Sequence, residues 1–100
     1  MKAKIICLCG SLRFKKTFGA IELMYVLRGY IVLTPCCMYV DAQRTDTYME
    51  HKEQFDKMHK AKIDIADEVY IINENGYIGE STMSELEYAS SLKKKIIFME

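Results

Sequence analysis

Glycine, hydroxyl and charged side chains follow the first apolar run of this 100-residue chain, and their types and spacing suit the binding of an anion. Gly10, Ser11 and Arg13 come directly after residues 5–8. A glycine lets the backbone approach a ligand, and a turn that leads into a helix offers free N–H groups to phosphate. Arg13 adds a guanidinium that can form two parallel hydrogen bonds. The group predicts a phosphate site, with Ser11 as a simple helix N-cap as the alternative.

A second group surrounds Glu85, which follows a glycine-punctuated stretch. Thr82 and Glu85 have the spacing of a capping box, in which the two side chains satisfy the first N–H groups of a helix. The glutamate also shares an inward helical face with Tyr88, Ala89 and Leu92. A partly desolvated carboxylate at a helix start can act as a nucleophile or stabilise a developing charge. Spacing alone leaves both interpretations open.

His59 is the third candidate, and it shares a helical face with Phe55. It is either a buried histidine at the edge of the core or a proton donor that reaches into a site. His51 lies two helical turns away, which is too far for both imidazoles to bind one metal ion without further ligands.

The cysteines occur in two close pairs. A secreted disulfide scaffold needs dispersed pairs, so we expect reduced thiols in a cytoplasmic protein. Cys-x-Cys with Cys-Cys is an unusual spacing for tetrahedral zinc, and the sequence therefore predicts no metal and no cofactor. The four residues are Cys7, Cys9, Cys36 and Cys37.

Composition excludes several classes of protein. Lys and Arg number 14, as do Asp and Glu, so the formal net charge is zero and no nucleic-acid partner is expected. Hydrophobic residues make up 50% of the chain, which is an ordinary globular content, yet no run approaches the length of a membrane span. The length predicts one domain over residues 1–100.

Short apolar runs alternate with helical patterns, in the order β-α-β-α-β-α-β. This order predicts an α/β fold with a parallel sheet and helices on both faces. We expect a second strand that is buried on both faces, a polar loop over 36–47, and a second helix with Phe55, Met58 and Ile65 inward. Ligands bind at the carboxyl edge of such sheets, where the three candidate groups converge. The expected strands are 5–8, 30–34, 68–73 and 95–99, and the expected helices are 14–28, 48–65 and 81–92.

Three motifs, in order along essentially the whole chain, resemble the nucleoside 2-deoxyribosyltransferases and the 2′-deoxynucleoside 5′-phosphate N-hydrolases. Residues 9–13 (Cys-Gly-Ser-Leu-Arg) resemble the family's opening loop, 65–69 its Ala-Asp entry to the third strand, and 79–89 its glycine-rich turn and following helix. The resemblance implies a Rossmann-like, flavodoxin-type, three-layer sheet of about four strands, with one such domain over 1–100. It also implies cleavage of the N-glycosidic bond of a nucleoside or nucleoside 5′-monophosphate.

The resemblance also implies roles for single residues. Glu85 matches the glutamate that attacks C1′ of the sugar, and His59 stands where the family has a second carboxylate that helps to protonate the leaving base. A histidine can still donate that proton. The family tyrosine in the first strand falls at Cys7. The residues expected to hold the sugar-phosphate end are Gly10, Ser11, Arg13, Gly79, Ser81 and Thr82.

The expected partners are a small-molecule nucleoside or nucleotide and further copies of the chain. The family's fifth strand is missing and a neighbouring subunit completes the family's site, so the resemblance implies a homodimer or larger assembly. Three alternatives stay open: a non-catalytic nucleotide-binding module, a phosphoribohydrolase that acts on a ribonucleoside monophosphate, and a structural protein in which Glu85 is only a cap. The phosphoribohydrolase turn resembles residues 76–85 with a spacing two residues off.

Overall fold

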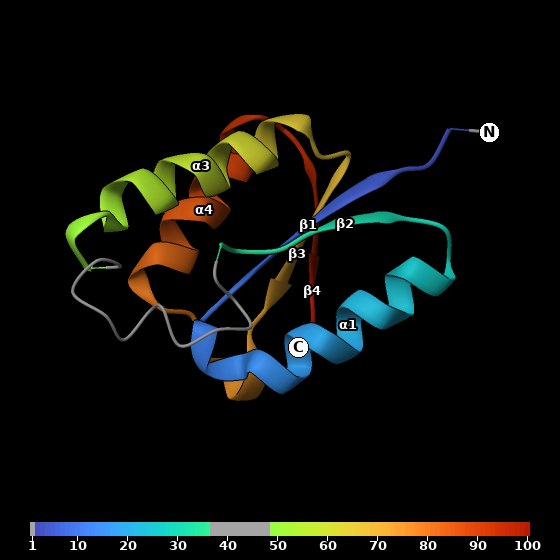
Figure 1. Ribbon diagram of the computed structural model, residues 1–100, viewed down its shortest axis with the longest axis horizontal. Helices are drawn as coiled ribbons and strands as arrows, with labels where there is room; N and C mark the ends of the chain where they lie inside the picture. The colour runs from blue at the N-terminus through green and yellow to red at the C-terminus, as the bar shows by residue number, and fades with distance from the viewer. Residues whose placement is uncertain (1, 37–48) are drawn as a thin grey trace.

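The structure is a computed structural model that describes residues 2–36 and 49–100 (Figure 1). The loop predicted over 36–47 lies, apart from Cys36, outside the described residues. Within the described ranges, no helix is long and apolar enough to cross a membrane. The elements are β1 (Ile5–Gly10), a 3-10 turn (Leu12–Phe14), α1 (Lys15–Leu27), β2 (Ile31–Leu33), α3 (Lys52–Ile65), β3 (Glu68–Ile72), a 3-10 turn (Glu74–Gly76), α4 (Glu80–Ser91) and β4 (Lys95–Phe98).

The strands form one parallel sheet in the order β2-β1-β3-β4. This is the flavodoxin-type order, in which the chain winds to one side of β1 and then to the other. The predicted α/β class, strand count and flavodoxin-type arrangement are confirmed. The change of winding direction leaves a crevice beyond the carboxyl ends of β1 and β3, where ligands bind in such sheets.

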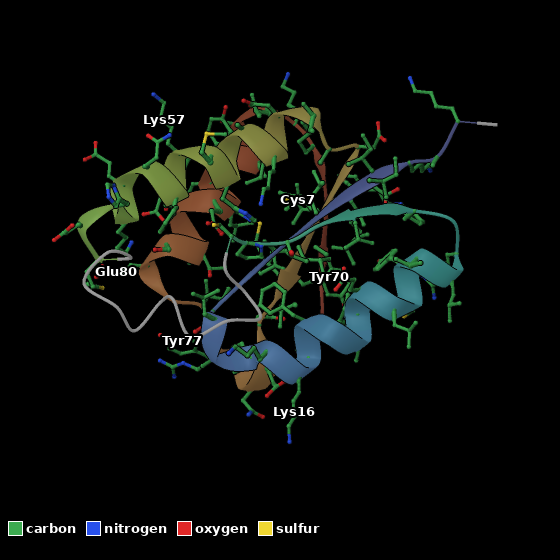
Figure 2. All side chains as sticks on the ribbon, viewed as in Figure 1. Cys7, Lys16, Lys57, Tyr70, Tyr77 and Glu80 are labelled. Atoms are coloured by element: carbon green, nitrogen blue, oxygen red, sulfur yellow. The ribbon has the colours of Figure 1, made fainter. Side chains whose placement is uncertain are left out.

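Two helical layers cover the sheet, and the alternation of β1 side chains feeds both layers. Ile6 and Leu8 face α1, where they pack with Phe18. Cys7 and Cys9 face the opposite side, which α3 and α4 cover (Figure 1). In Figure 2, Cys7 and Tyr70 lie inside the molecule, whereas Lys16 and Lys57 point away from it. The cysteine side of β1 is therefore the side against which the candidate-site helices pack.

The two central strands are buried, but the prediction of a second strand buried on both faces is wrong. β2 lies at an edge of the sheet, and its first residue, Ile31, is 50% exposed. An apolar run shows only that a segment suits a strand, because the number of neighbouring strands depends on the winding of the whole chain.

The helix starting at Lys52 buries only part of the predicted face, on which Phe55 is half-buried. Met58 and Ile65 are exposed, and the buried side chains are His59 and Ile63, which lie one turn apart. A residue adjacent to His59 points about 100° away from it around the helix, so Met58 cannot share its burial. The end of α1 agrees with the prediction, because Gly29 follows it with φ = +88°, as expected of a helix-terminating glycine.

Gly10 ends β1 at a point of close approach, and its substitution should destabilise the fold. A Cβ there would lie 3.0 Å from Cβ of Ile72 and 3.2 Å from Cζ of Phe18. We expect Gly10→Ala to lower the free energy of unfolding by about 1–3 kcal/mol. The matched control is Gly19→Ala in α1, where a Cβ meets nothing within 4 Å. Removing a helical glycine there should stabilise by about 0.5–1 kcal/mol. Urea unfolding measures both, and wild-type stability in Gly10→Ala would contradict the close approach.

Candidate active site

A pocket of about 460 Å³ opens at the carboxyl edge of the sheet. It is walled by the loops after the first three strands and by the first turns of α3 and α4. Its volume lies within the range usual for small-molecule sites. The lining residues are Gly10, Ser11, Leu12, Pro35, Cys36, Lys52, Phe55, Asp56, His59, Tyr77, Gly79, Glu80, Ser81, Thr82 and Glu85. The pocket thus brings together every sequence-predicted site residue except Arg13.

Glu85 lies in the second turn of α4, with 8% of its surface exposed. The predicted capping box is wrong. The N-cap is Gly79, whose carbonyl accepts from the Met83 N–H at 2.9 Å, so Thr82 already lies within the first turn. Leu92, predicted to share the inward face, is 41% exposed, because it is the C-cap residue that follows the helix. The Glu85 carboxylate is therefore free of a capping role and lies on the pocket wall.

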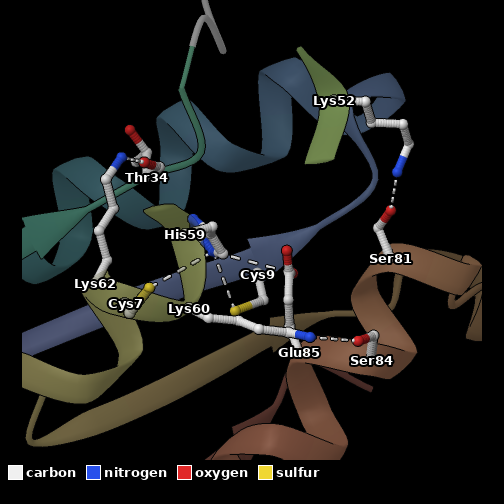
Figure 3. A network of polar contacts seen from close by, with 10 residues as sticks. All are labelled: Cys7, Cys9, Thr34, Lys52, His59, Lys60, Lys62, Ser81, Ser84 and Glu85. Carbon is white, nitrogen blue, oxygen red and sulfur yellow. Dashed lines mark hydrogen bonds and ion pairs between the residues drawn. The ribbon is translucent and has the colours of Figure 1, made fainter. Parts of the chain in front are cut away.

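His59 comes from α3 and occupies the space between β1 and α4 (Figure 3). Its Nε2 lies 3.4 Å from Sγ of Cys9 and 3.6 Å from Sγ of Cys7. The same nitrogen lies 4.0 Å from Oε1 of Glu85. Nδ1 is buried and has no hydrogen-bond partner among the described residues. The imidazole thus connects the pocket carboxylate with two buried thiols.

Burial and close contact shift the pKa values of these groups. Burial raises the pKa of Glu85 to about 6, although the nearby imidazole of His59 acts in the opposite direction. Burial alone would lower the pKa of His59, but contacts with Cys7 and the charge of Glu85 outweigh it, so the pKa is raised. A hydrogen bond with Cys9 lowers the pKa of Cys7 to about 5, whereas the pKa of Cys9 is raised well above its usual range, first by that same contact. At neutral pH, Glu85 is therefore mainly a carboxylate.

The predicted phosphate loop has mixed placement. Ser11 is the N-cap of the 3-10 turn, and its Oγ accepts from the Arg13 N–H at 3.3 Å, so the capping alternative is confirmed while the side chain also lines the pocket. Arg13 lies outside the lining residues. Its guanidinium stacks on Tyr77 at 4.1 Å from the ring centroid and donates to the Tyr77 hydroxyl at 3.2 Å. Arg13 thus contacts Tyr77, a residue that lines the pocket.

Three charged residues of the pocket were missed by the sequence reasoning: Lys52, Asp56 and Glu80. Nζ of Lys52 lies 2.9 Å from Oδ2 of Asp56 and 3.0 Å from Oγ of Ser81, so it joins α3 to the start of α4 (Figure 3). Asp56 lies three residues before His59, on the same side of α3. The sequence reasoning placed many of the charges of this helix on the solvent face. The i, i+3 spacing from His59 was the signal that could have found Asp56.

The buried cluster under the pocket has the composition of a metal site. Single donor atoms of Cys7, Cys9 and His59 lie within 4.8 Å of one another. Cys36, by contrast, is exposed on the pocket wall, and Cys37 lies outside the described residues. Two sulfur donors and one imidazole suit Zn²⁺ or another soft ion.

Comparison with known proteins supports the fold. No family model matches the chain, and a search of curated proteins gives no match. Among solved structures, a 2-desoxiribosyltransferase from Leishmania mexicana superposes with a TM-score of 0.69 at 16% identity, over 95% of this chain. The match covers 63% of the length of that protein. The chain therefore has the nucleoside 2-deoxyribosyltransferase-like fold that the motifs implied.

The raised pKa of Glu85 makes its charge a burden on the folded state. The folded protein holds the carboxyl proton more tightly than the unfolded chain, so this stability is present below pH 4.5 and is lost as pH rises through about 6. Gln cannot ionise. From pH 4.5 to 7.5, the stability of the wild type relative to Glu85→Gln should fall by up to about 2 kcal/mol. Urea unfolding in a chelating buffer measures this, and a difference that does not change with pH would contradict it.

Proposed function

We propose that this protein cleaves the N-glycosidic bond of a nucleoside or nucleoside 5′-monophosphate, with Glu85 as the nucleophile. One observation carries the proposal: a buried carboxylate without a capping role lies on the wall of a pocket at the winding switch of the sheet. Keeping such a carboxylate desolvated costs stability, which is typical of groups retained for chemistry. The likeness in fold to a deoxyribosyltransferase supports the same activity.

In the proposed reaction, an oxygen of Glu85 attacks C1′ of the bound sugar while the bond from C1′ to the base nitrogen breaks. The electron pair of that bond leaves with the base, which takes up a proton. The transition state resembles an oxocarbenium ion, and an adjacent carboxylate stabilises it. Water in a hydrolase, or a second base in a transferase, then attacks C1′ from the opposite face and frees Glu85. Two displacements retain the configuration at C1′.

His59 is the proposed proton donor to the departing base. Contacts with Cys7 and the charge of Glu85 raise its pKa, which favours the protonated form, and it lines the pocket 4.0 Å from the Glu85 carboxylate. Asp56 lies on the same wall one turn earlier, where it pairs with Lys52. The same pocket thus contains the carboxylate that is proposed to attack C1′ and a neighbouring acid. Glycosidic cleavage requires such a pair.

The sugar-phosphate end is proposed to bind where the first loop meets the start of α4. The N–H groups at the start of α4 have no side-chain cap and adjoin the pocket, so they suit an anion. Lys52 adds a positive charge at the same place through its contact with Ser81. Arg13 is proposed to contribute to binding through its hydrogen bond to Tyr77, which lines the pocket. The binding residues are Gly10, Ser11, Arg13, Gly79, Ser81 and Thr82.

The base-release assay tests the activity. We expect wild-type protein to release free base from deoxynucleosides, ribonucleosides or their 5′-monophosphates, and Glu85→Gln to lose at least about 1,000-fold in rate, as loss of a nucleophile implies. Chromatography separates the products, and near-ultraviolet circular dichroism shows that the variant is folded. We also propose that the protein is cytoplasmic and forms a homodimer or larger assembly. Sedimentation of the same sample measures its oligomeric state.

Two results would overturn the proposed activity. Base release that survives in Glu85→Gln excludes this nucleophile. A folded wild-type protein that releases no base, while nucleotides raise its melting temperature, identifies the non-catalytic binding module instead.

Lys52 should select for the phosphate. We expect Lys52→Met to raise KM for a 5′-monophosphate by about 5–10-fold, because one partly exposed charge-assisted contact is lost. KM for the matching nucleoside should stay unchanged. The control is Lys57→Met, which removes an equal charge from the solvent side of α3 (Figure 2). Equal changes for nucleoside and nucleotide would show that Lys52 does not contact the phosphate.

A further inference from the structure

The thiols of β1 take no direct part in the proposed glycosidic reaction, although Cys7 helps to raise the pKa of His59. They are also placed as ligands. Cys7 and Cys9 are two residues apart on one strand, so both side chains point to the face that α3 covers. His59 of α3 directs Nε2 between them. Strand alternation and helix packing therefore converge three donor atoms from positions 50 residues apart in sequence.

The distances match tetrahedral zinc. With bonds of about 2.3 Å to sulfur and about 2.0 Å to nitrogen, the sulfur and nitrogen ligands of one Zn²⁺ lie about 3.6 Å apart. The two sulfur-to-Nε2 distances are 3.6 and 3.4 Å. The carboxylate of Glu85 stands 4.0 Å from the same nitrogen, where about 3.4 Å is expected of two zinc ligands. Glu85 is not among the donor atoms that lie within 4.8 Å of one another, so its carboxylate has to move toward the sulfurs to complete the shell.

The surroundings supply charge balance and a route. Two thiolates and a carboxylate around Zn²⁺ leave one net negative charge, and the charge of Lys62 already acts on Cys7. Both thiols are fully buried, but His59 and Glu85 line the pocket, so an ion reaches the cluster through it. Nδ1 of His59 has no acceptor among the described residues, which weakens the site relative to zinc centres whose outer shell is complete.

We propose that Cys7, Cys9 and His59 bind one Zn²⁺ ion, with Glu85 as the fourth ligand. The zinc-bound state engages the same carboxylate that the glycosidic reaction needs, so zinc and catalysis exclude each other. This consequence rests on the proposed function, whereas the binding of zinc does not. The proposal gives the two thiols a chemical role. If they only filled the core, they would not need to lie against an imidazole.

Metal titration of the reduced 100-residue chain tests the proposal. Zn²⁺ competed against a chromophoric chelator should bind with one equivalent per chain and raise the melting temperature. Co²⁺ should give the thiolate charge-transfer band and the intense visible bands of a tetrahedral site. The double variant Cys7→Ala/Cys9→Ala should lose at least about 100-fold in affinity together with the charge-transfer band. The matched control, Cys36→Ala, removes an exposed thiol and should keep both.

Three outcomes would overturn the zinc site. They are a wild-type Co²⁺ spectrum without a thiolate band, affinity unchanged in the double variant, or equal loss in Cys36→Ala. The wild-type spectrum decides even if the double variant does not fold. Base release is measured on metal-free protein in a chelating buffer, and metal binding is measured separately. A protein that binds zinc but releases no base when metal-free overturns only the glycosidic activity, and the reverse result overturns only the zinc site.

Discussion

The parallel pairing of β1 with β3, both buried in the centre of the sheet, is the constraint on which the rest of the structure depends. Once β1 is covered on both sides, each of its side chains must face one of two helical layers. Ile6 and Leu8 pack on α1 and supply the ordinary apolar core. Cys7 and Cys9 face α3 and α4, so the polarisable side of the strand lies under the pocket. The alternation of side chains along β1 thus places its apolar residues in the core with α1 and its thiols beneath the pocket.

The contact between His59 and Glu85 is the part of that arrangement that costs the fold stability. Both groups are ionisable and almost fully buried, and Nδ1 of His59 has no hydrogen-bond partner among the described residues. A core of similar shape built from apolar residues would be at least as stable. The proposed glycosidic reaction and the proposed zinc site each give this polar cluster a use, and both depend on the same Glu85 carboxylate. Because both uses need the same carboxylate, the proposed zinc binding and the proposed glycosidic reaction cannot occur at the same time.

Sequence patterns predicted the layers of the fold well and the faces of single elements less well. The glycine after α1 and the four apolar runs were interpreted correctly, because caps and strands depend on local chemistry. The inward face of α3 was wrong at Met58 and Ile65, which are exposed, whereas His59, one of whose two interpretations was a histidine at the edge of the core, is buried. The capping box at Thr82 was wrong because the N-cap is Gly79, three residues earlier. The roles of Gly10, Ser11, Arg13, Gly79, Ser81 and Thr82 in binding remain predictions.

By itself, the sequence determined the order of strands and helices, the edge of the sheet that carries the polar loops, and the residue types available there. These follow from local hydrophobic period and from turn chemistry, which act over a few residues. Only the tertiary structure decided that β2 is an edge strand and that Lys52 and Asp56 join the pocket wall. It also decided that His59 stands between the β1 thiols and Glu85. Those facts depend on how elements far apart in the chain pack together, and the distance between two packed side chains is a property of no single segment.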